Sequence, residues 1–285
     1  MRDVSPVPPS GGSSPRPHDP MSVVEHLEEL RYRLLVCVAA VTIGTIGAFV
    51  VHDQILALLL RPLPMQAGAL GILGGEHRLA VTGVGEAFAV VLRISLAAGL
   101  ALATPVWIYH LWAFVAPALR GRERRYALPF TVLGVALFVT GLAVGFVTLR
   151  YPIAWLRSFS ARSFVEIITA DNYFTFVAYF LLAFGLTFEL PLVLTGLVVM
   201  GVVSPHALRT HRVSILIGLW TASCFVTPGA DPYSPLILGV AFTALFFVSM
   251  GLIRFIDPAS ATDPIQISAT GVVASTNGAV EERLG

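Results

Sequence analysis

Long apolar stretches separated by short polar segments are the main pattern of this chain. Six stretches almost free of charged residues can be recognised, at residues 34–51, 94–116, 127–149, 173–200, 213–226 and 235–253. A helix needs about 20 residues to cross the roughly 30 Å hydrocarbon core of a bilayer, and most of these stretches have about that length. The pattern predicts an all-α, polytopic membrane protein with six transmembrane helices.

The fifth stretch is shorter than the others. As a helix, residues 213–226 would extend only about 21 Å, and a turn containing Pro228, Gly229 and Pro232 follows directly. A helix of that length does not cross an unperturbed bilayer. We expect either that the membrane is thinner around the fifth and sixth helices or that protein shields part of this hairpin.

Polar segments flank the apolar region at both ends. Residues 1–21 contain six prolines and a Ser/Gly-rich stretch, and residues 257–285 are rich in Ser, Thr, Gly and Pro. Such compositions are typical of disordered chain, and the first segment lacks the apolar core of a cleavable signal peptide. The sequence therefore predicts one membrane domain at residues 22–256 between two disordered cytoplasmic arms.

The distribution of arginine predicts the orientation. All 18 basic residues are arginine. If the amino terminus is cytoplasmic, twelve of them lie on the inner side of the membrane and six on the outer side. Basic residues accumulate on the cytoplasmic side of membrane proteins. Both termini are therefore expected in the cytoplasm, with the helices in the cell membrane.

Composition and missing motifs exclude several classes of function. Only 12% of the residues are charged and the mean hydropathy is +0.80, whereas soluble domains carry about 25% charged residues. Without lysine there is no Walker A site and no Schiff base. Zinc-protease, dinucleotide-binding and nucleophile-elbow motifs do not occur in the sequence. We expect no enzyme activity, metal, cofactor or nucleic-acid partner.

Acidic residues beside the first two apolar stretches are candidate binding groups. Apolar residues at positions 22–34 have the spacing of an amphipathic helix. Three glutamates, among them Glu29, lie in one five-residue segment of this helix, residues 25–29. Helices on the inner membrane surface usually carry basic residues instead. Glu123 is the only acid among four arginines in the loop after the second stretch. Two simpler alternatives remain open: a Glu29–Arg33 pair on a solvated face, and local charge balancing at Glu123.

Glu189 is a third candidate because it lies within an otherwise uncharged stretch. A carboxylate at the bilayer centre costs about 2.5–3.5 kcal/mol on insertion scales, so a functional or partner-contacting role is the first interpretation. A protonated glutamate that only packs inside the protein is the alternative. Pro191 removes a backbone donor two residues later and predicts a bend, as Pro105 does in the second stretch.

Four segments carry a combined signature. They are residues 26–34; residues 105–119, with Pro105, Phe114 and Pro117, leading to 123–125; residues 184–191; and residues 226–228 with Asp231. In content, order and spacing they resemble TatC, the multi-spanning core of the twin-arginine (Sec-independent) protein translocase. The resemblance extends over roughly residues 22–255.

The resemblance implies six transmembrane helices with both termini in the cytoplasm, in agreement with the arginine distribution. It also implies that the chain recognises the paired arginines of a signal peptide and helps to export folded proteins with the proton-motive force. Glu29, Arg31 and Glu123 match positions that bind the signal peptide. The implied partners are cargo signal peptides, membrane lipid, further copies of the chain, and single-span TatA- and TatB-like subunits, which Glu189 would contact.

One segment differs from the family pattern. TatC proteins commonly have a shorter Thr-Pro-Pro-Asp turn, whereas Gly229 and Ala230 precede Asp231 here. The role of Asp231 therefore stays open.

Two other functions are alternatives to protein translocation. A proton-coupled small-molecule transporter would use Glu189 as proton carrier, but transporters commonly have repeats with matching broken helices, and Pro105 has no counterpart in the fifth stretch. An intramembrane hydrolase would need a nucleophile and a base on facing helices, and Ser223 with His110 is the one pair to check.

Overall fold

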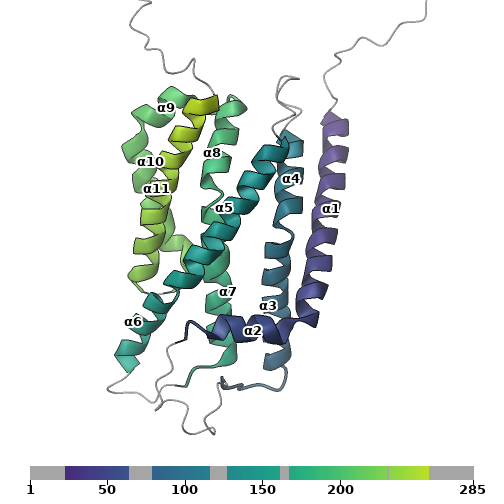
Figure 1. Cartoon of the computed structure of the whole chain (residues 1–285), viewed down its shortest axis with the longest axis vertical. Helices are drawn as coiled ribbons and strands as arrows, with labels where there is room; N and C mark the ends of the chain where they lie inside the picture. Colours follow the sequence, from purple (N-terminus) through teal and green to yellow (C-terminus); the bar gives the residue numbers. More distant parts are fainter. Residues whose placement is uncertain (1–22, 64–78, 116–126, 161–166, 230, 257–285) are drawn as a thin grey trace, which may run out of the picture.

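The computed structural model describes residues 23–63, 79–115, 127–160, 167–229 and 231–256. These residues are almost entirely helical, and their one β contact is an isolated parallel bridge between Ala80 and Thr169. The long helices run side by side in one bundle, while α2 crosses its lower end in Figure 1. The all-α prediction is confirmed. The two predicted disordered arms lie outside the described residues.

The described part of the chain consists mainly of helices. In chain order they are α1 (Val23–Val50), α2 (His52–Leu60), α3 (Glu86–Leu102), α4 (Thr104–Val115), α5 (Ala127–Thr148), α6 (Arg150–Ser160), α7 (Ala170–Thr187), α8 (Leu190–Val199), α9 (Pro205–Thr210), α10 (Arg212–Val226) and α11 (Tyr233–Ile256).

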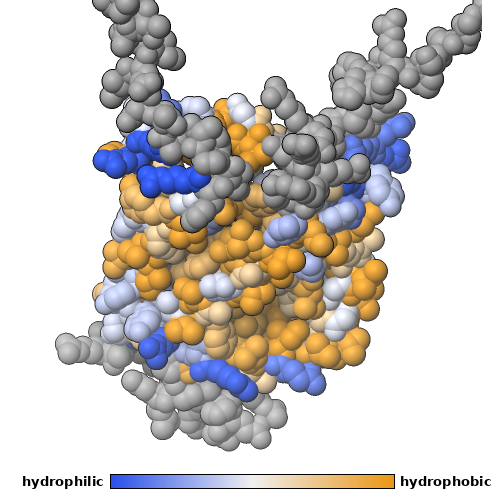
Figure 2. All heavy atoms as spheres, turned by 45° about the horizontal axis from the view of Figure 1, so that its top comes forward, coloured by the Kyte–Doolittle hydropathy of each residue, from blue (hydrophilic) through white to orange (hydrophobic). Residues whose placement is uncertain are grey.

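Several helical stretches are long and apolar enough to cross a membrane. Four candidate spans are Leu27–Val50, Leu128–Phe159, Ala170–Val199 and Tyr233–Arg254, of which the second contains α5 with α6 and the third α7 with α8; a fifth is the bent pair α3 and α4. α10 has 15 residues and is shorter, as the sequence predicted. Figure 2 shows the result on one face, where hydrophobic side chains form a broad belt and hydrophilic groups gather at the two ends. This distribution is that of a membrane protein.

The second span bends where Pro105 predicted. α3 and α4 meet at Ala103 with an angle of 50° between them, and Pro105 is the second residue of α4. The predicted start of this span at residue 94 was wrong, because α3 begins at Glu86 and includes Arg93. That arginine is accommodated because its guanidinium donates to Asp171 Oδ1 at 2.6 Å and to the Thr175 hydroxyl on α7.

A second break separates α7 from α8. Phe188 and Glu189 lie between the two helices, and Pro191 occupies the first turn of α8. Proline has no N–H and so cannot continue the ladder of the preceding helix. The helix is interrupted just before Pro191, and the backbone of Glu189 lies at the break.

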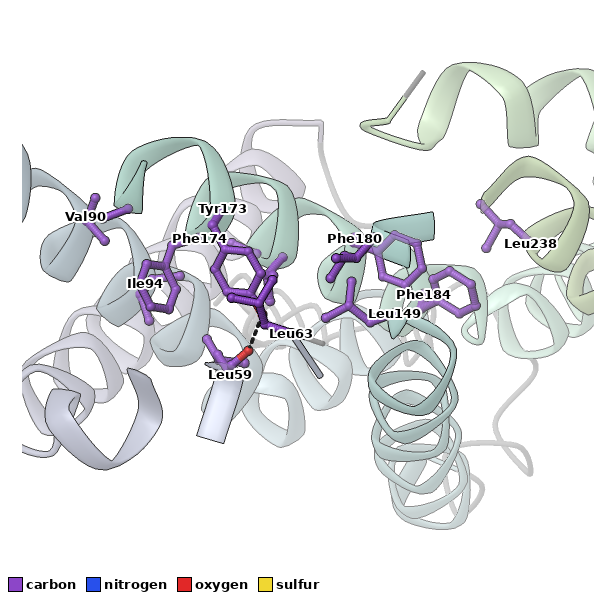
Figure 3. Close-up of a cluster of buried hydrophobic side chains, with 14 of the residues drawn as sticks. Leu59, Leu63, Val90, Ile94, Leu149, Tyr173, Phe174, Phe180, Phe184 and Leu238 are labelled. Atoms are coloured by element: carbon purple, nitrogen blue, oxygen red, sulfur yellow. Dashed lines mark hydrogen bonds between the residues drawn. The ribbon is translucent and has the colours of Figure 1, made fainter. Parts of the chain in front are cut away.

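The core lies around α7, in the half of the bundle that α2 crosses, where aromatic side chains pack against small residues. Phe180 and Phe184 are fully buried, and a side chain at Gly145 of α5 would collide with Phe184. Figure 3 shows this cluster together with the one hydrogen bond drawn in it, from the Tyr173 hydroxyl to the Leu59 carbonyl at 2.7 Å. That bond fixes the crossing helix α2 to the core.

The first helix attaches to the bundle by a close crossing with α3. A Cβ atom on Gly99 would lie 2.5 Å from the backbone nitrogen of Thr45, and one on Gly44 would lie 2.8 Å from the Gly99 carbonyl oxygen. Only glycine permits backbones to approach so closely. α1 is otherwise the least buried of the long spans. Its position therefore depends mainly on this crossing with α3, with a lesser contact to α4.

Candidate functional site

Glu29 lies on the first half of α1, close to the end of α4. Its Oε1 atom accepts a hydrogen bond from Arg33 Nε at 3.1 Å, and the Arg33 Nη2 atom approaches the same oxygen. The i,i+4 pair expected from the sequence is therefore present. Arg33 also lies within electrostatic range of His110 on α4, so the two helices converge here.

The carboxylate of Glu29 is not on a solvated face. Its side chain is 22% exposed, and Oε2 is buried with no hydrogen-bond partner among the described residues. A carboxylate has about four acceptor positions, of which a single arginine on the same helix fills only part. The group thus combines partial burial with unused acceptor capacity. Both properties strengthen its interaction with a further cation.

The other residues expected in this site have different positions. Arg31 is exposed on α1, two residues from Glu29 and therefore about 200° around the helix from it. Glu123 and Pro117 lie outside the described residues, between α4 and α5. Phe114 belongs to α4, and Pro105 is exposed at its start. The structure therefore brings Glu29 to α4, whose end leads into the segment that contains Glu123.

Polar ring atoms line α4 beside this region. Trp107 Nε1, His110 Nδ1 and Trp112 Nε1 are buried and have no hydrogen-bond partner within the described part of the chain. Burial of these atoms shows that the polar atoms of the three rings point into the protein.

Glu189 is buried at the break between α7 and α8. It is 6% exposed, and its Oε1 atom has no hydrogen-bond partner in the described segments. Two buried threonines near it in the sequence, Thr187 and Thr195, form no hydrogen bond with it among the described residues. The Thr195 hydroxyl donates instead to the Pro191 carbonyl at 2.6 Å. The carboxyl group therefore retains acceptor capacity inside the membrane region.

The flank of Glu189 is an exposed apolar stripe. Tyr179, Leu186 and Val193 are exposed and recur every seven residues along α7 and α8, with Glu189 between the last two. Seven residues make almost two helical turns, so the three side chains share one face. A neighbouring helix lying on this stripe would pass next to the break.

Packing between α4 and α8 connects the two glutamate regions. Ile108 and Leu192 both approach Gly134 of α5, and the Trp112 ring lies where a side chain on Gly196 would be, 2.9 Å from the Cβ position. Large side chains thus fit against glycines on neighbouring helices. This arrangement joins the helix next to Glu29 to the helix that follows Glu189.

Asp231 has a local structural contact. Its Oδ1 atom accepts the backbone N–H of Ser234 at 2.7 Å and its Oδ2 atom accepts the Ser234 hydroxyl at 2.7 Å. Both contacts satisfy donors in the first turn of α11, which is the action of a helix cap. The extended turn before Asp231 therefore still delivers a capping carboxylate.

The pair considered for an intramembrane hydrolase is not assembled. Ser223 lies on α10, which packs against α11, and its hydroxyl donates to the Trp220 carbonyl at 2.7 Å. His110 lies on α4, which packs against α1 and α5. No nucleophile–base contact joins the two.

A polar network between α3 and the start of α7 was not predicted from the sequence. Glu86 Oε1 accepts the backbone N–H of Asp171 at 3.3 Å, and Asp171 in turn binds Arg93. These groups are separated by many residues in the chain, so no local pattern could indicate them. They join the amino-terminal ends of α3 and α7.

Comparison with known proteins agrees with this architecture. Residues 25–241 match the family described as Sec-independent protein translocase protein (TatC). The TatC protein of Carboxydothermus hydrogenoformans is 33% identical over 240 residues, which cover 84% of this chain and 95% of that protein. Bacillus subtilis TatCd is 34% identical over 236 residues, which cover 82% of this chain and 92% of that protein. For Frankia casuarinae TatC the identity is 32%, and the match spans only 65% of that longer protein.

A solved structure gives the same result. A crystal structure of the twin-arginine translocase receptor TatC superposes with a TM-score of 0.66 at 28% identity and covers 81% of this chain and 99% of that one. The family match extends over more than two thirds of the chain and includes both glutamate regions of the described structure. The chain belongs to the TatC family of Sec-independent protein translocase proteins.

Proposed function

We propose that this chain is the signal-peptide receptor of a twin-arginine translocase in the cell membrane. In this proposal six helices cross the membrane, both termini are cytoplasmic, and folded cargo is exported with the proton-motive force. The end of the bundle that carries the start of α1, α9 and the end of α11 then faces the cytoplasm. The family match favours this function over a small-molecule transporter.

The observation that carries the proposal is the environment of Glu29. This carboxylate already binds one guanidinium, that of Arg33, and keeps a buried oxygen without a partner among described residues. A guanidinium presents paired planar donors that match a carboxylate, whereas an ammonium does not. Glu29, supported by Glu123 from the segment after α4 and by Arg31 on α1, would therefore select arginine over lysine.

Glu189 and Pro191 would form a second site for single-span TatA- or TatB-like subunits. The exposed stripe of Tyr179, Leu186 and Val193 would receive a partner helix. A polar group on that helix would bind the unfilled acceptor of Glu189 at the break between α7 and α8. Further copies of the chain and membrane lipid would cover the remaining apolar surface.

Export in cells tests the proposal directly. We expect the chain to restore export of a folded reporter that carries a twin-arginine signal peptide in cells lacking their own TatC. The same reporter with two lysines in place of the arginines serves as the control. Export of both reporters would contradict the proposal. So would export of neither reporter when the chain is stably inserted in the membrane.

Substitution of Glu189 separates a partner site from simple packing. Glu189→Gln keeps the shape and a hydrogen-bonding group, so we expect most of the export and most of the crosslinking to single-span subunits to remain. Glu189→Ala removes both properties and should impair both readouts. Crosslinking from a photoreactive residue at Leu186 provides the contact measurement. Equal behaviour of the two variants, with crosslinking and export unchanged, would leave packing as the only role.

Cysteine labelling tests the proposed orientation. Single cysteines at positions 122 and 209 should resist an impermeant thiol reagent in intact cells, while a cysteine at position 162 should react. The native cysteines, Cys37 and Cys224, are both free and are replaced first. Labelling at position 122 in intact cells would reverse the assignment.

A further inference from the structure

The ends of α9, α10 and α11 form a basic corner that the proposed receptor function does not use. Leu208 of α9 is buried in one cluster with Ile253 of α11. This packing brings Arg209, next to Leu208, to the same corner as Arg254, next to Ile253. Figure 1 shows α9 at the top of the bundle, beside the ends of α10 and α11.

The charge of this corner has no acidic counterpart on the helices that form it. Residues 190–230 and 232–256 contain no aspartate or glutamate. Arg209, Arg212 and Arg254 are therefore not balanced by a carboxylate from α8, α9, α10 or α11. The next acid in the sequence is Asp257, which lies outside the described residues.

The Arg209 side chain is only partly exposed to solvent. Its Nε atom is buried and has no hydrogen-bond partner among the residues described. A buried donor on a charged group is costly unless an acceptor is provided. An anion at the corner would provide that acceptor.

The beginning of α10 adds to the preference for an anion. Arg212 is the first residue of α10, and the cap residue His211 makes no side-chain hydrogen bond to the helix. The first N–H groups of a helix carry partial positive charge, which favours anions and disfavours cations. A basic residue at this end therefore weakens the helix unless an anion binds there.

The surface below the basic corner indicates the kind of anion. Val213, Ile217 and Trp220 are exposed on α10 and follow one another at helical spacing, beginning at the residue after Arg212. A free phosphate would not use this apolar strip. A phospholipid would use both parts, with its phosphate at the arginines and an acyl chain along the strip.

We infer that Arg209, Arg212, Arg254 and the start of α10 bind the phosphodiester headgroup of an anionic phospholipid. The site uses the cytoplasmic orientation proposed above but none of the residues assigned to signal-peptide binding. It differs from an ordinary excess of positive charge by its buried Nε atom and its helix terminus. The lipid would hold the short helix α10 against the inner leaflet.

Native mass spectrometry of the purified full chain tests the inference. Phosphatidylglycerol should bind more tightly than phosphatidylcholine of the same chain length. In the triple variant Arg209→Gln, Arg212→Gln and Arg254→Gln the affinity for phosphatidylglycerol should fall by about fivefold per arginine, on the order of 100-fold in total. The matched control removes three outer arginines, by Arg61→Gln, Arg150→Gln and Arg157→Gln, and should change it little.

Each other outcome would overturn a stated part of the inference. Equal losses in the two triple variants would show unspecific attraction by net charge. Displacement of phosphatidylglycerol by inorganic phosphate would show an anion site that does not use the acyl chain. A gain of more than tenfold on Asp257→Asn would show that the tail carboxylate, rather than a lipid, satisfies the arginines. Signal-peptide binding is measured on the same samples, so failure of the lipid site is distinguishable from failure of the receptor function.

Discussion

Gly99→Ala is expected to detach α1 from the bundle. The new Cβ atom would lie 2.5 Å from the Thr45 backbone nitrogen and 2.7 Å from its Cα atom, and backbone atoms cannot rotate away as a side chain can. Overpacking typically costs about 1–3 kcal/mol, and a backbone collision belongs at or above the upper end of that range. We expect a lower unfolding temperature in detergent and loss of signal-peptide binding, because α1 carries Glu29.

Gly47→Ala, on α1, is the matched control for this substitution. Gly47 lies on α1 one turn from Gly44, and a Cβ atom there meets nothing within 4 Å. Alanine is about 1 kcal/mol better than glycine in a helix interior, so this variant should be as stable as the parent or slightly more stable. Equal effects of the two substitutions would contradict the close crossing of α1 and α3.

Glu29→Ala is expected to weaken binding of a twin-arginine signal peptide by about 10- to 150-fold. A hydrogen bond to a charged group contributes about 1.5–3 kcal/mol, and the partial burial of Glu29 limits screening by water. Glu123→Ala should give a loss of the same kind. Isothermal titration with a synthetic peptide measures both, and membrane levels of the variants should equal those of the parent.

The neighbouring Glu28 provides the control for Glu29. It is exposed on the same turn of α1, so Glu28→Ala removes the same charge without touching the partly buried carboxylate. Its effect should stay within about threefold, as expected for a solvated charge. Unchanged peptide binding in the Glu29→Ala, Glu123→Ala double variant would exclude both glutamates from recognition.

The long helices were predictable because their signal is strong and local. Apolar length located the spans, and the two prolines located the breaks at Ala103 and at Phe188–Glu189. α3 begins at Glu86, eight residues before the predicted start at residue 94. The prediction failed because the charged Arg93 interrupts the apolar stretch. Its charge is neutralised by Asp171, 78 residues away in the chain, and such a pairing leaves no trace in the local pattern.

Short helices and burial were much less predictable. α2, α6 and α9 are too short for a span and were not anticipated, and α2 is held by the tertiary bond from Tyr173 to Leu59. The chemistry of Glu29 and Glu189 was indicated by their unusual positions in the sequence. That one oxygen of Glu29 is buried, and that Glu189 is enclosed rather than exposed, depends on how the helices pack.

The most direct test compares twin-arginine and twin-lysine peptides on the parent chain and on Glu29→Gln. Glutamine keeps the size of the side chain but loses the charge that pairs with a guanidinium. The proposed recognition predicts that the parent prefers the twin-arginine peptide by at least tenfold and that Glu29→Gln loses most of this preference. An equal loss of affinity for both peptides, or an unchanged preference in Glu29→Gln, would contradict it.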